Sequence, residues 1–341
     1  MIRASAAGFS LVALLAGSDG ARAQGLQGGF DDAARTAVVH HAAEALQQRY
    51  VFPDVGNRAA EIIEAALTAG NYAGEDPVRF ALEMTRDLQS ETHDKHVRVY
   101  TLTTPPPAAS ATVQSVSPNE ESGIVRADRL AENIGYIEVA SFPELPQFRP
   151  SLDQAMAALA STRALIIDSR RNHGGSPASE AYLASYFLDG KKRIAVSKYI
   201  LRNPRTETFH TQMYWSSRTP ESYAGKPVYV LTSRESISAG EAVAYDMRAL
   251  GVAVIIGDPT GGGANGGGLV PLGHGMAMFV PIARAENPTT GTSWEALGVA
   301  PDVPAPAAIA LQVALKKLGV TSPFTQIADL SKARLFRPDD R

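Results

Sequence analysis

From Ile134 onward, strand-like and helix-like segments alternate along the chain, and this alternation constrains the fold more than any other feature. Strands that alternate with helices form a largely parallel sheet with helices on its faces. The sequence therefore predicts an α/β core over residues 134–320. Its strands are expected at 134–140, 164–168, 228–231 and 252–257, and its helices at 152–160, 178–188, 239–250 and 307–318.

A helical region precedes this core. Residues 25–92 carry three helical patterns, which predict an N-terminal helical domain, a three-helix bundle. The third pattern opens with Asp76 and Pro77, a cap followed by proline at the first helical position. Residues 93–133 are expected to form a connecting strand and a proline-rich linker, and residues 321–341 a polar tail.

Residues 1–24 have the features of a secretory signal peptide. Arg3 supplies the charged start, residues 6–17 are apolar, and a small-residue cleavage site ends at Ala23. We expect cleavage near Ala23 and a periplasmic or secreted mature protein. The apolar run is too short for a stable membrane span, and no later segment reaches about 18 apolar residues.

Charge and cysteine content exclude several classes of function. The formal net charge is −3 without a long run of one sign, so no nucleic-acid partner is expected. The absence of cysteine excludes disulfides, thiolate catalysis and cysteine metal sites. The glycine-rich segments lack the lysine of a phosphate-binding loop. No cofactor or metal is expected, and the sequence does not indicate an oligomeric state.

Ser238 lies where a predicted strand turns into a predicted helix. A hydroxyl there meets the positive end of the helix dipole and unpaired backbone amides. A nucleophilic serine needs such amides, because they stabilise the oxyanion that forms when it attacks a carbonyl. Ser238 and Glu241 equally fit a capping box, which begins a helix without any chemistry.

Three further positions have both a catalytic and a plain structural interpretation. Gly174 and Gly175 follow a buried strand and suit either an oxyanion hole or an ordinary glycine turn. His96 suits a general base, since an imidazole titrates near neutrality, but with His93 it also suits a metal pair or the surface. Glu295 suits either an acid that orients the histidine or an exposed turn residue.

Six motifs occur in a fixed order along the chain. They are D-x-H at 94–96, I-G-Y from 134, D-x-R-x-N-x-G-G from 168, S-x-S-A-x-E from 236, I-G-D-P-T-G-G-G-A from 256 and W-E-x-x-G-V-x-P-D from 294. Together they resemble the serine peptidase family of tail-specific and C-terminal-processing proteases. The resemblance is strongest to the branch of the tricorn protease core and the interphotoreceptor retinoid-binding protein.

This resemblance implies a crotonase/Clp-protease-like core with an N-terminal helical domain, acting on a peptide or protein substrate. It implies Ser238 as nucleophile, His96 as base and Glu295 as the acid that supports the base. The oxyanion donors implied are the backbone amide of Ala239 and one from Gly174 or Gly175.

The chain departs from the family pattern in three ways. Lysine-using relatives carry their base in the segment that contains Gly263, but no lysine occurs between Lys226 and Lys316, so a Ser-Lys pair is excluded on that alignment. The region before Ile134 is too short for the PDZ domain that many relatives insert, so no PDZ domain is expected. Lys95 stands where tricorn-like relatives have a bridging serine.

Because Lys95 replaces the serine that bridges the histidine to the glutamate in tricorn-like relatives, Asp94 or a water would have to connect His96 to Glu295. His93 is the alternative base. A non-catalytic binder of apolar ligands or peptides on the same fold remains open. An esterase or acyl transferase that uses the same serine remains open as well.

Overall fold

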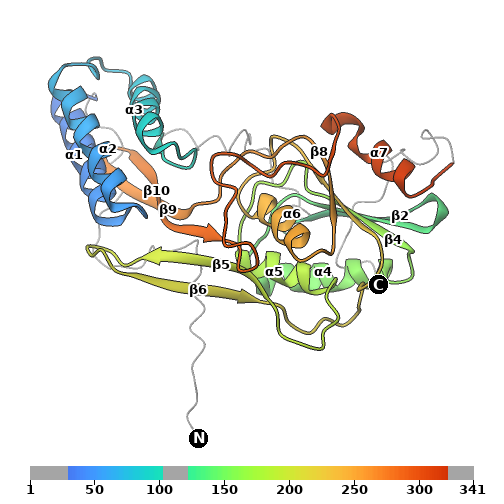
Figure 1. Ribbon diagram of the computed structural model, residues 1–341. Coiled ribbons are helices and arrows are strands. Elements are labelled where there is room, and N and C mark those ends of the chain that lie inside the picture. The colour runs from blue at the N-terminus through green and yellow to red at the C-terminus, as the bar shows by residue number, and fades with distance from the viewer. Residues whose placement is uncertain (1–29, 103–121, 322–341) are drawn as a thin grey trace, which may run out of the picture.

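Figure 1 shows the computed structural model of the protein, which describes residues 30–102 and 122–321. The expected signal peptide, most of the linker and the C-terminal tail lie outside the described residues. Within the described residues, no helix is long and apolar enough to cross a membrane.

A six-stranded sheet forms the centre of the molecule. Its strand order is β11-β8-β7-β4-β3-β2, in which β2 is antiparallel to β3 and all other neighbours are parallel. The strands are β2 (Ile124–Leu130), β3 (Ile134–Val139), β4 (Ala164–Asp168), β7 (Val228–Thr232), β8 (Val254–Gly257) and β11 (Val303–Pro304). The α/β core predicted from the alternating segments is confirmed.

Helices cover both faces of this sheet (Figure 1). Leu165 and Ile167 pack with three helices on one face, whereas Ile166 packs with Leu311 on the other. The sequence of a strand that is buried on both faces is a continuous apolar run, as residues 164–167 of β4 are. The helices are α4 (Leu145–Leu159), α5 (Pro177–Ser185) and α6 (Ala239–Ala249) on the first face and α7 (Ala310–Lys317) on the second.

A second sheet, which the sequence does not predict, lies between this core and the N-terminal helices (Figure 1). It is antiparallel, with strand order β1-β10-β5-β6 and β9 paired to β10. Its strands are β1 (Arg98–Thr101), β5 (Ala195–Arg202), β6 (Phe209–Trp215), β9 (Gly266–Gly273) and β10 (Met276–Glu286). Of these, only β1 was expected.

The three N-terminal helices form where the sequence predicts them. They are α1 (Asp32–Arg49), α2 (Pro53–Thr68) and α3 (Pro77–Thr92). The carboxylate of Asp76 accepts the N–H of Val78 at 2.9 Å and so caps α3. The helices share a hydrophobic cluster with the second sheet, in which Leu46 packs with Met278 and Val280. The helical region is therefore anchored to that sheet, and the domain boundaries at 25–92, 93–133 and 134–320 stay a prediction.

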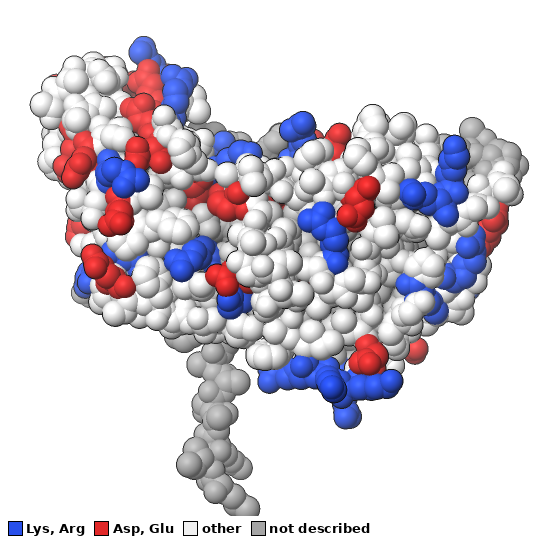
Figure 2. Space-filling view, viewed as in Figure 1, with Lys and Arg blue, Asp and Glu red and all other residues white. Residues whose placement is uncertain are grey.

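Acidic and basic side chains are interspersed over the face shown in Figure 2, with one basic group at its lower edge. This distribution agrees with the small net charge of the chain. No broad strip of one sign crosses this face.

Candidate active site

The candidate residues gather at one edge of the six-stranded sheet. Gly174 follows β4, Ser238 follows β7 and Gly263 follows β8, and these three strands are parallel neighbours. The carboxyl ends of parallel strands lie at the same edge, so loops that are distant in sequence meet there. A Cβ built on Gly174 would lie only 2.6 Å from Ser238 Cβ.

Ser238 has a strained backbone at the start of α6. Its φ is 58° and its ψ is −126°, and such angles cost a non-glycine residue about 1–3 kcal/mol. Its N–H donates to the carbonyl of Gly263 at 3.1 Å and to the carboxylate of Glu241 at 3.0 Å. The bond to Glu241 is one half of the predicted capping box, so capping and a sharp strand-to-helix turn coexist here.

Ser236 has a different environment from Ser238. It is fully buried, and its hydroxyl donates to the carbonyl of Ser169 at 2.7 Å. The same oxygen accepts the N–H of Ser233 at 3.0 Å. Because the backbone occupies both functions of this hydroxyl, Ser236 braces the turn that carries Ser238.

The two glycines after β4 need their lack of a side chain. Gly174 and Gly175 have φ values of 90° and 133°, and a Cβ on Gly175 would lie 2.1 Å from the carbonyl oxygen of Phe142. The N–H of Gly174 donates to Asn172 Oδ1 at 2.8 Å, which removes it as a free donor. Among the described residues, no acceptor is bonded to the N–H of Gly175 or of Ala239, the first residue of α6.

Glu241 joins the start of α6 to the glycine-rich loop after β8. Its buried carboxylate accepts hydrogen bonds of 2.5 to 3.0 Å from the Thr260 hydroxyl and from the N–H groups of Ser238, Gly262 and Gly263. Burial raises the pKa of Glu241, and these four donors oppose that effect. The sequence alone indicates only a capping role for Glu241.

His96 reaches this loop from the N-terminal part of the chain, between α3 and β1. A Cβ on Gly263 would lie 2.6 Å from His96 Cε1 and 3.1 Å from Nε2. The imidazole stacks on Phe279, with 5.7 Å between ring centroids. Gly263 therefore contacts the imidazole while its carbonyl bonds to Ser238, which brings the predicted base and nucleophile to the same loop.

Asp94 is the carboxylate beside the other nitrogen of His96. Its Oδ1 lies 3.5 Å from His96 Nδ1 and accepts the backbone N–H of His96 at 2.9 Å. Its Oδ2 accepts from the Tyr50 hydroxyl at 3.3 Å and from Asn265 Nδ2 at 2.9 Å. Burial lowers the pKa of His96, but the interaction with Asp94 and the charges of Glu295 and Glu241 outweigh it and raise the pKa overall.

Glu295 lies in the same cluster without a hydrogen bond to His96. Its Oε2 accepts the N–H groups of Ala264 and Asn265 at 2.5 and 2.9 Å. Its Oε1, like His96 Nδ1, is buried and has no hydrogen-bond partner among the described residues. Burial, followed by the charge of Asp94, raises the pKa of Glu295 to about 7, although the two amides and His96 oppose this rise.

Asp94, His96 and Glu295 also form the one group of three potential metal ligands among the described residues. Each offers one ligand atom, and these atoms lie within 4.8 Å of one another. Imidazole and carboxylate bind zinc, but the same arrangement suits a proton relay that needs no ion. The exposed His93 ends α3 and is not part of this group.

Lys95, which stands where tricorn-like relatives have a bridging serine, has a hydrogen-bond acceptor for its ammonium group. Its ammonium group donates a hydrogen bond to the carbonyl of Gly261 in the loop after β8. The position next to His96 Nδ1 is taken by Asp94 instead.

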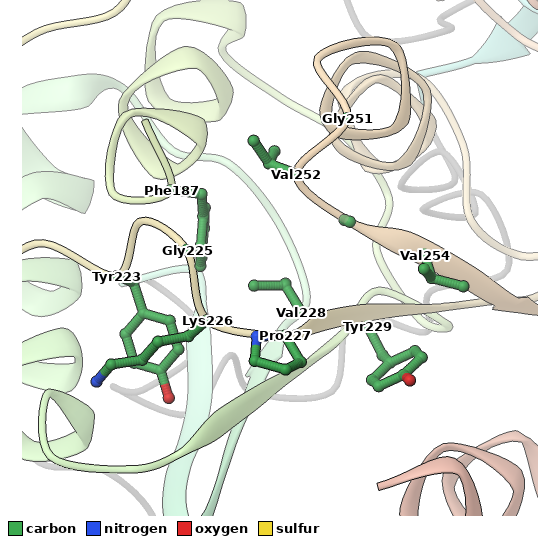
Figure 3. A pocket seen from close by; sticks show the side chains of 11 residues that line it. Phe187, Tyr223, Gly225, Lys226, Pro227, Val228, Tyr229, Gly251, Val252 and Val254 are labelled. Carbon is green, nitrogen blue, oxygen red and sulfur yellow. The ribbon is translucent and has the colours of Figure 1, made fainter. Parts of the chain in front are cut away.

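A separate pocket of about 380 Å³ lies at the opposite edge of the sheet (Figure 3). Its lining includes Pro227 to Tyr229 at the amino end of β7 and Val254 at the amino end of β8. Because Ser238 follows the carboxyl end of β7, this pocket is not part of the candidate site.

Among solved structures, the protein resembles a peptidase from Parabacteroides merdae, with 19% identity, a TM-score of 0.60 and coverage of 86% of this chain and 99% of that one. A photosystem II D1 C-terminal processing protease has 15% identity and a TM-score of 0.53 over 81% of this chain and 94% of that one. The tricorn protease has 16% identity and a TM-score of 0.54 over 83% of this chain and 36% of that one. At these identities the likeness concerns the fold.

At the sequence level, a curated relative is the chloroplastic carboxyl-terminal-processing peptidase 2 of Arabidopsis thaliana, 27% identical over 175 residues. The match covers 51% of this chain but only 32% of the relative, so it spans about a third of the relative's length. Residues 133–305, just over half of the chain, match Peptidase family S41. The chain therefore belongs to peptidase family S41, a family of serine-type hydrolases.

Proposed function

We propose that the chain is a serine endopeptidase in which Ser238 is the nucleophile and His96 the general base. The observation that carries this proposal is the strained turn at Ser238. It lies beside the N–H groups of Gly175 and Ala239, which have no acceptor among the described residues. Strain of this kind persists in proteins mainly where function requires it.

The reaction follows from the placement of these groups. The proton of Ser238 Oγ moves to His96 Nε2 as Oγ bonds to the scissile carbonyl carbon. The oxyanion accepts hydrogen bonds from the N–H groups of Gly175 and Ala239, each worth about 3–4 kcal/mol in the transition state. The carbon–nitrogen bond then breaks, and His96 gives the proton to the leaving amine. Water hydrolyses the acyl-serine by the reverse proton path.

Two carboxylates support His96 in this scheme. Asp94 accepts the backbone N–H of His96 and lies next to His96 Nδ1. We assign to Asp94 the role of orienting the imidazole ring of His96 and stabilising its protonated form. Glu295, which accepts the N–H groups of Ala264 and Asn265, supplies a second negative charge that favours the protonated imidazole of His96. In this assignment Asp94 takes over the role that the family resemblance gives to a bridging serine.

The test is labelling with a fluorophosphonate probe followed by identification of the modified residue. Ser238→Ala should abolish labelling and peptide hydrolysis. Ser236→Ala is the matched control, because its hydroxyl bonds only to backbone groups, and it should keep much of both. Labelling that disappears in Ser236→Ala alone would contradict the assignment.

The same assay separates the other candidate functions. A non-catalytic binder should not react with the probe at all. An esterase or acyl transferase should react but should hydrolyse esters without cleaving any peptide of a diverse library.

The proposed site of action is outside the cytoplasm, in the periplasm or the medium. It rests on the signal-like residues 1–24, whose small-residue site ends at Ala23. The N-terminus of protein recovered from the exported fraction should lie at Gln24 or Gly25. An intact Met1 on exported protein would reject the cleavage.

A further inference from the structure

Two buried carboxyl groups lie outside the candidate active site. Glu180 on α5 and Asp246 on α6 are both fully buried. Neither oxygen of Glu180 has a hydrogen-bond partner among the described residues, and the same holds for Oδ2 of Asp246. Oδ1 of Asp246 accepts one hydrogen bond, from Asn287 Nδ2 at 2.7 Å. Buried polar groups without partners are costly and call for an explanation.

The groups that the structure describes around this pair are neutral. Ser197 and Tyr199 face it from β5, and Tyr199 in turn packs against Tyr214 of β6. The nearby hydroxyl of Ser197 lowers the pKa of Asp246. It does not form a hydrogen bond with Asp246 Oδ2. Among the described residues, no Lys, Arg or His contributes to the charges that act on either carboxyl group.

Two negative charges in such surroundings repel each other and lose their hydration. Burial raises the pKa of Asp246 to about 7, against the donors from Asn287 and Ser197. Burial also raises the pKa of Glu180, which has no donor at all, and the charge of Asp246 raises it further. Glu180 is therefore the member that keeps its proton, and Asp246 the one that ionises first.

The pair lies between two helices that start at the candidate active site. α5 begins at Pro177, just after Gly175, and Glu180 lies in its first turn. α6 begins next to Ser238, and Asp246 lies about two turns further on. Asn287, the partner of Asp246, stands at the end of β10 and its side chain also orders the turn before Glu295.

We propose that Glu180 and Asp246 are positioning residues, which share at least one proton and thereby hold α5 and α6 in register for catalysis. With one proton bound, the pair can carry a single charge and form a hydrogen bond between carboxyl and carboxylate. When the second proton leaves, the two helices repel each other, and the spacing between Gly175 and Ser238 is lost. The effect on rate rests on the proposed function, but the effect on stability does not.

The first arm of the test measures stability in a Ser238→Ala background, which removes self-cleavage. The urea midpoint should fall as pH rises from about 5 to about 9, because both carboxyl groups are protonated more readily in the folded state. Glu180→Gln and Asp246→Asn, which stay neutral, should each reduce this fall, and the double variant should reduce it most. The exposed Glu221→Gln is the matched control and should keep the full fall.

The second arm measures the rate of fluorophosphonate labelling with Ser238 intact. Above the pH at which the second proton leaves, the rate of the parent protein should fall about tenfold per pH unit, since the protonated pair is depleted by that factor. Glu180→Gln should not show this alkaline fall. Glu221→Gln should follow the parent.

Each outcome decides a separate question. If the amide variants keep the full fall in urea midpoint, the shared proton is refuted. If the midpoints respond but the alkaline labelling rates of Glu180→Gln and its parent agree, the positioning role is refuted. If no variant labels at any pH, the proposed function fails while the stability arm still judges the pair. A midpoint that drops on treatment with EDTA would mean that a cation holds the pair instead of a proton.

Discussion

The imidazole of His96 occupies the space that a side chain at Gly263 would need, since a Cβ there would lie 2.6 Å from His96 Cε1. Lysine-using relatives of this family carry their base in the segment that contains this glycine. A lysine at position 263 would therefore have to displace the imidazole of His96 from its present position.

Gly263→Ala should lower kcat/KM by at least about tenfold, because the added methyl displaces His96, the proposed general base. The fold should tolerate the change, as Gly263 does not have a positive φ. Gly268→Ala is the control, because a Cβ there meets no atom within 4 Å. Equal activity of the two variants would mean that His96 does not take part in the reaction.

The pH dependence of kcat/KM should report the titration of His96. The rate should rise with pH as the imidazole loses its proton, with a midpoint above the ordinary value of about 6.5 because Asp94 raises the pKa. Asp94→Asn should move the midpoint down. His96→Ala should lose at least about a hundredfold, and the exposed His93→Ala little. Full activity in His96→Ala would transfer the role to another group.

Glu241→Gln should destabilise the protein, because an amide nitrogen would face N–H donors that now bond to a carboxylate oxygen. Each buried N–H left without an acceptor costs about 1–3 kcal/mol. The urea midpoint should fall, and the labelling rate of Ser238 should fall with it. The exposed Glu235→Gln provides the same chemical change without such donors. An unchanged midpoint in Glu241→Gln would contradict the bracing role.

The ionisation of Glu295 should lower the free energy of unfolding as pH rises. Its pKa is raised to about 7 in the folded protein, above an unfolded value of about 4.3, so its stabilising contribution is present below pH 4 and is lost towards pH 7. Glu295→Gln should reduce the fall in urea midpoint over that range. If the variant and the parent show parallel pH curves, the ionisation of Glu295 is not linked to folding.

Four strands of the central sheet, β3, β4, β7 and β8, could be predicted from the sequence, whereas β2 and β11 were not expected. β4 is buried on both faces, so residues 164–167 form an unbroken apolar run that marks the strand. The preceding helix begins at Leu145, whereas the sequence predicted a start at residue 152. The predicted start was too late because a proline such as Pro150 usually marks a helix boundary. Tertiary packing overrides that signal.

The second sheet could not be predicted in the same way. β9 consists of glycine-rich sequence, and β6 is largely exposed, so neither shows the alternation of a half-buried strand. β9 pairs with β10 and packs against α1, whereas β6 pairs with β5 and packs against α5, so these strands are defined by packing in the folded chain. The contacts of Asp94 with Tyr50 and Asn265 were missed because no local pattern indicates a partner more than forty positions away.

His96 directly precedes Val97 of the N-terminal hydrophobic cluster, and Ser238 directly precedes Ala239 of the central one, so the proposed base and nucleophile come from two halves of the chain. Residues 133–305, which carry the family match, contain Ser238 and Glu295 but not His96, Asp94 or Tyr50. In the proposed mechanism, peptide cleavage therefore requires the two halves to be folded against each other. If the two halves are co-expressed as separate fragments, peptidase activity should report whether they associate.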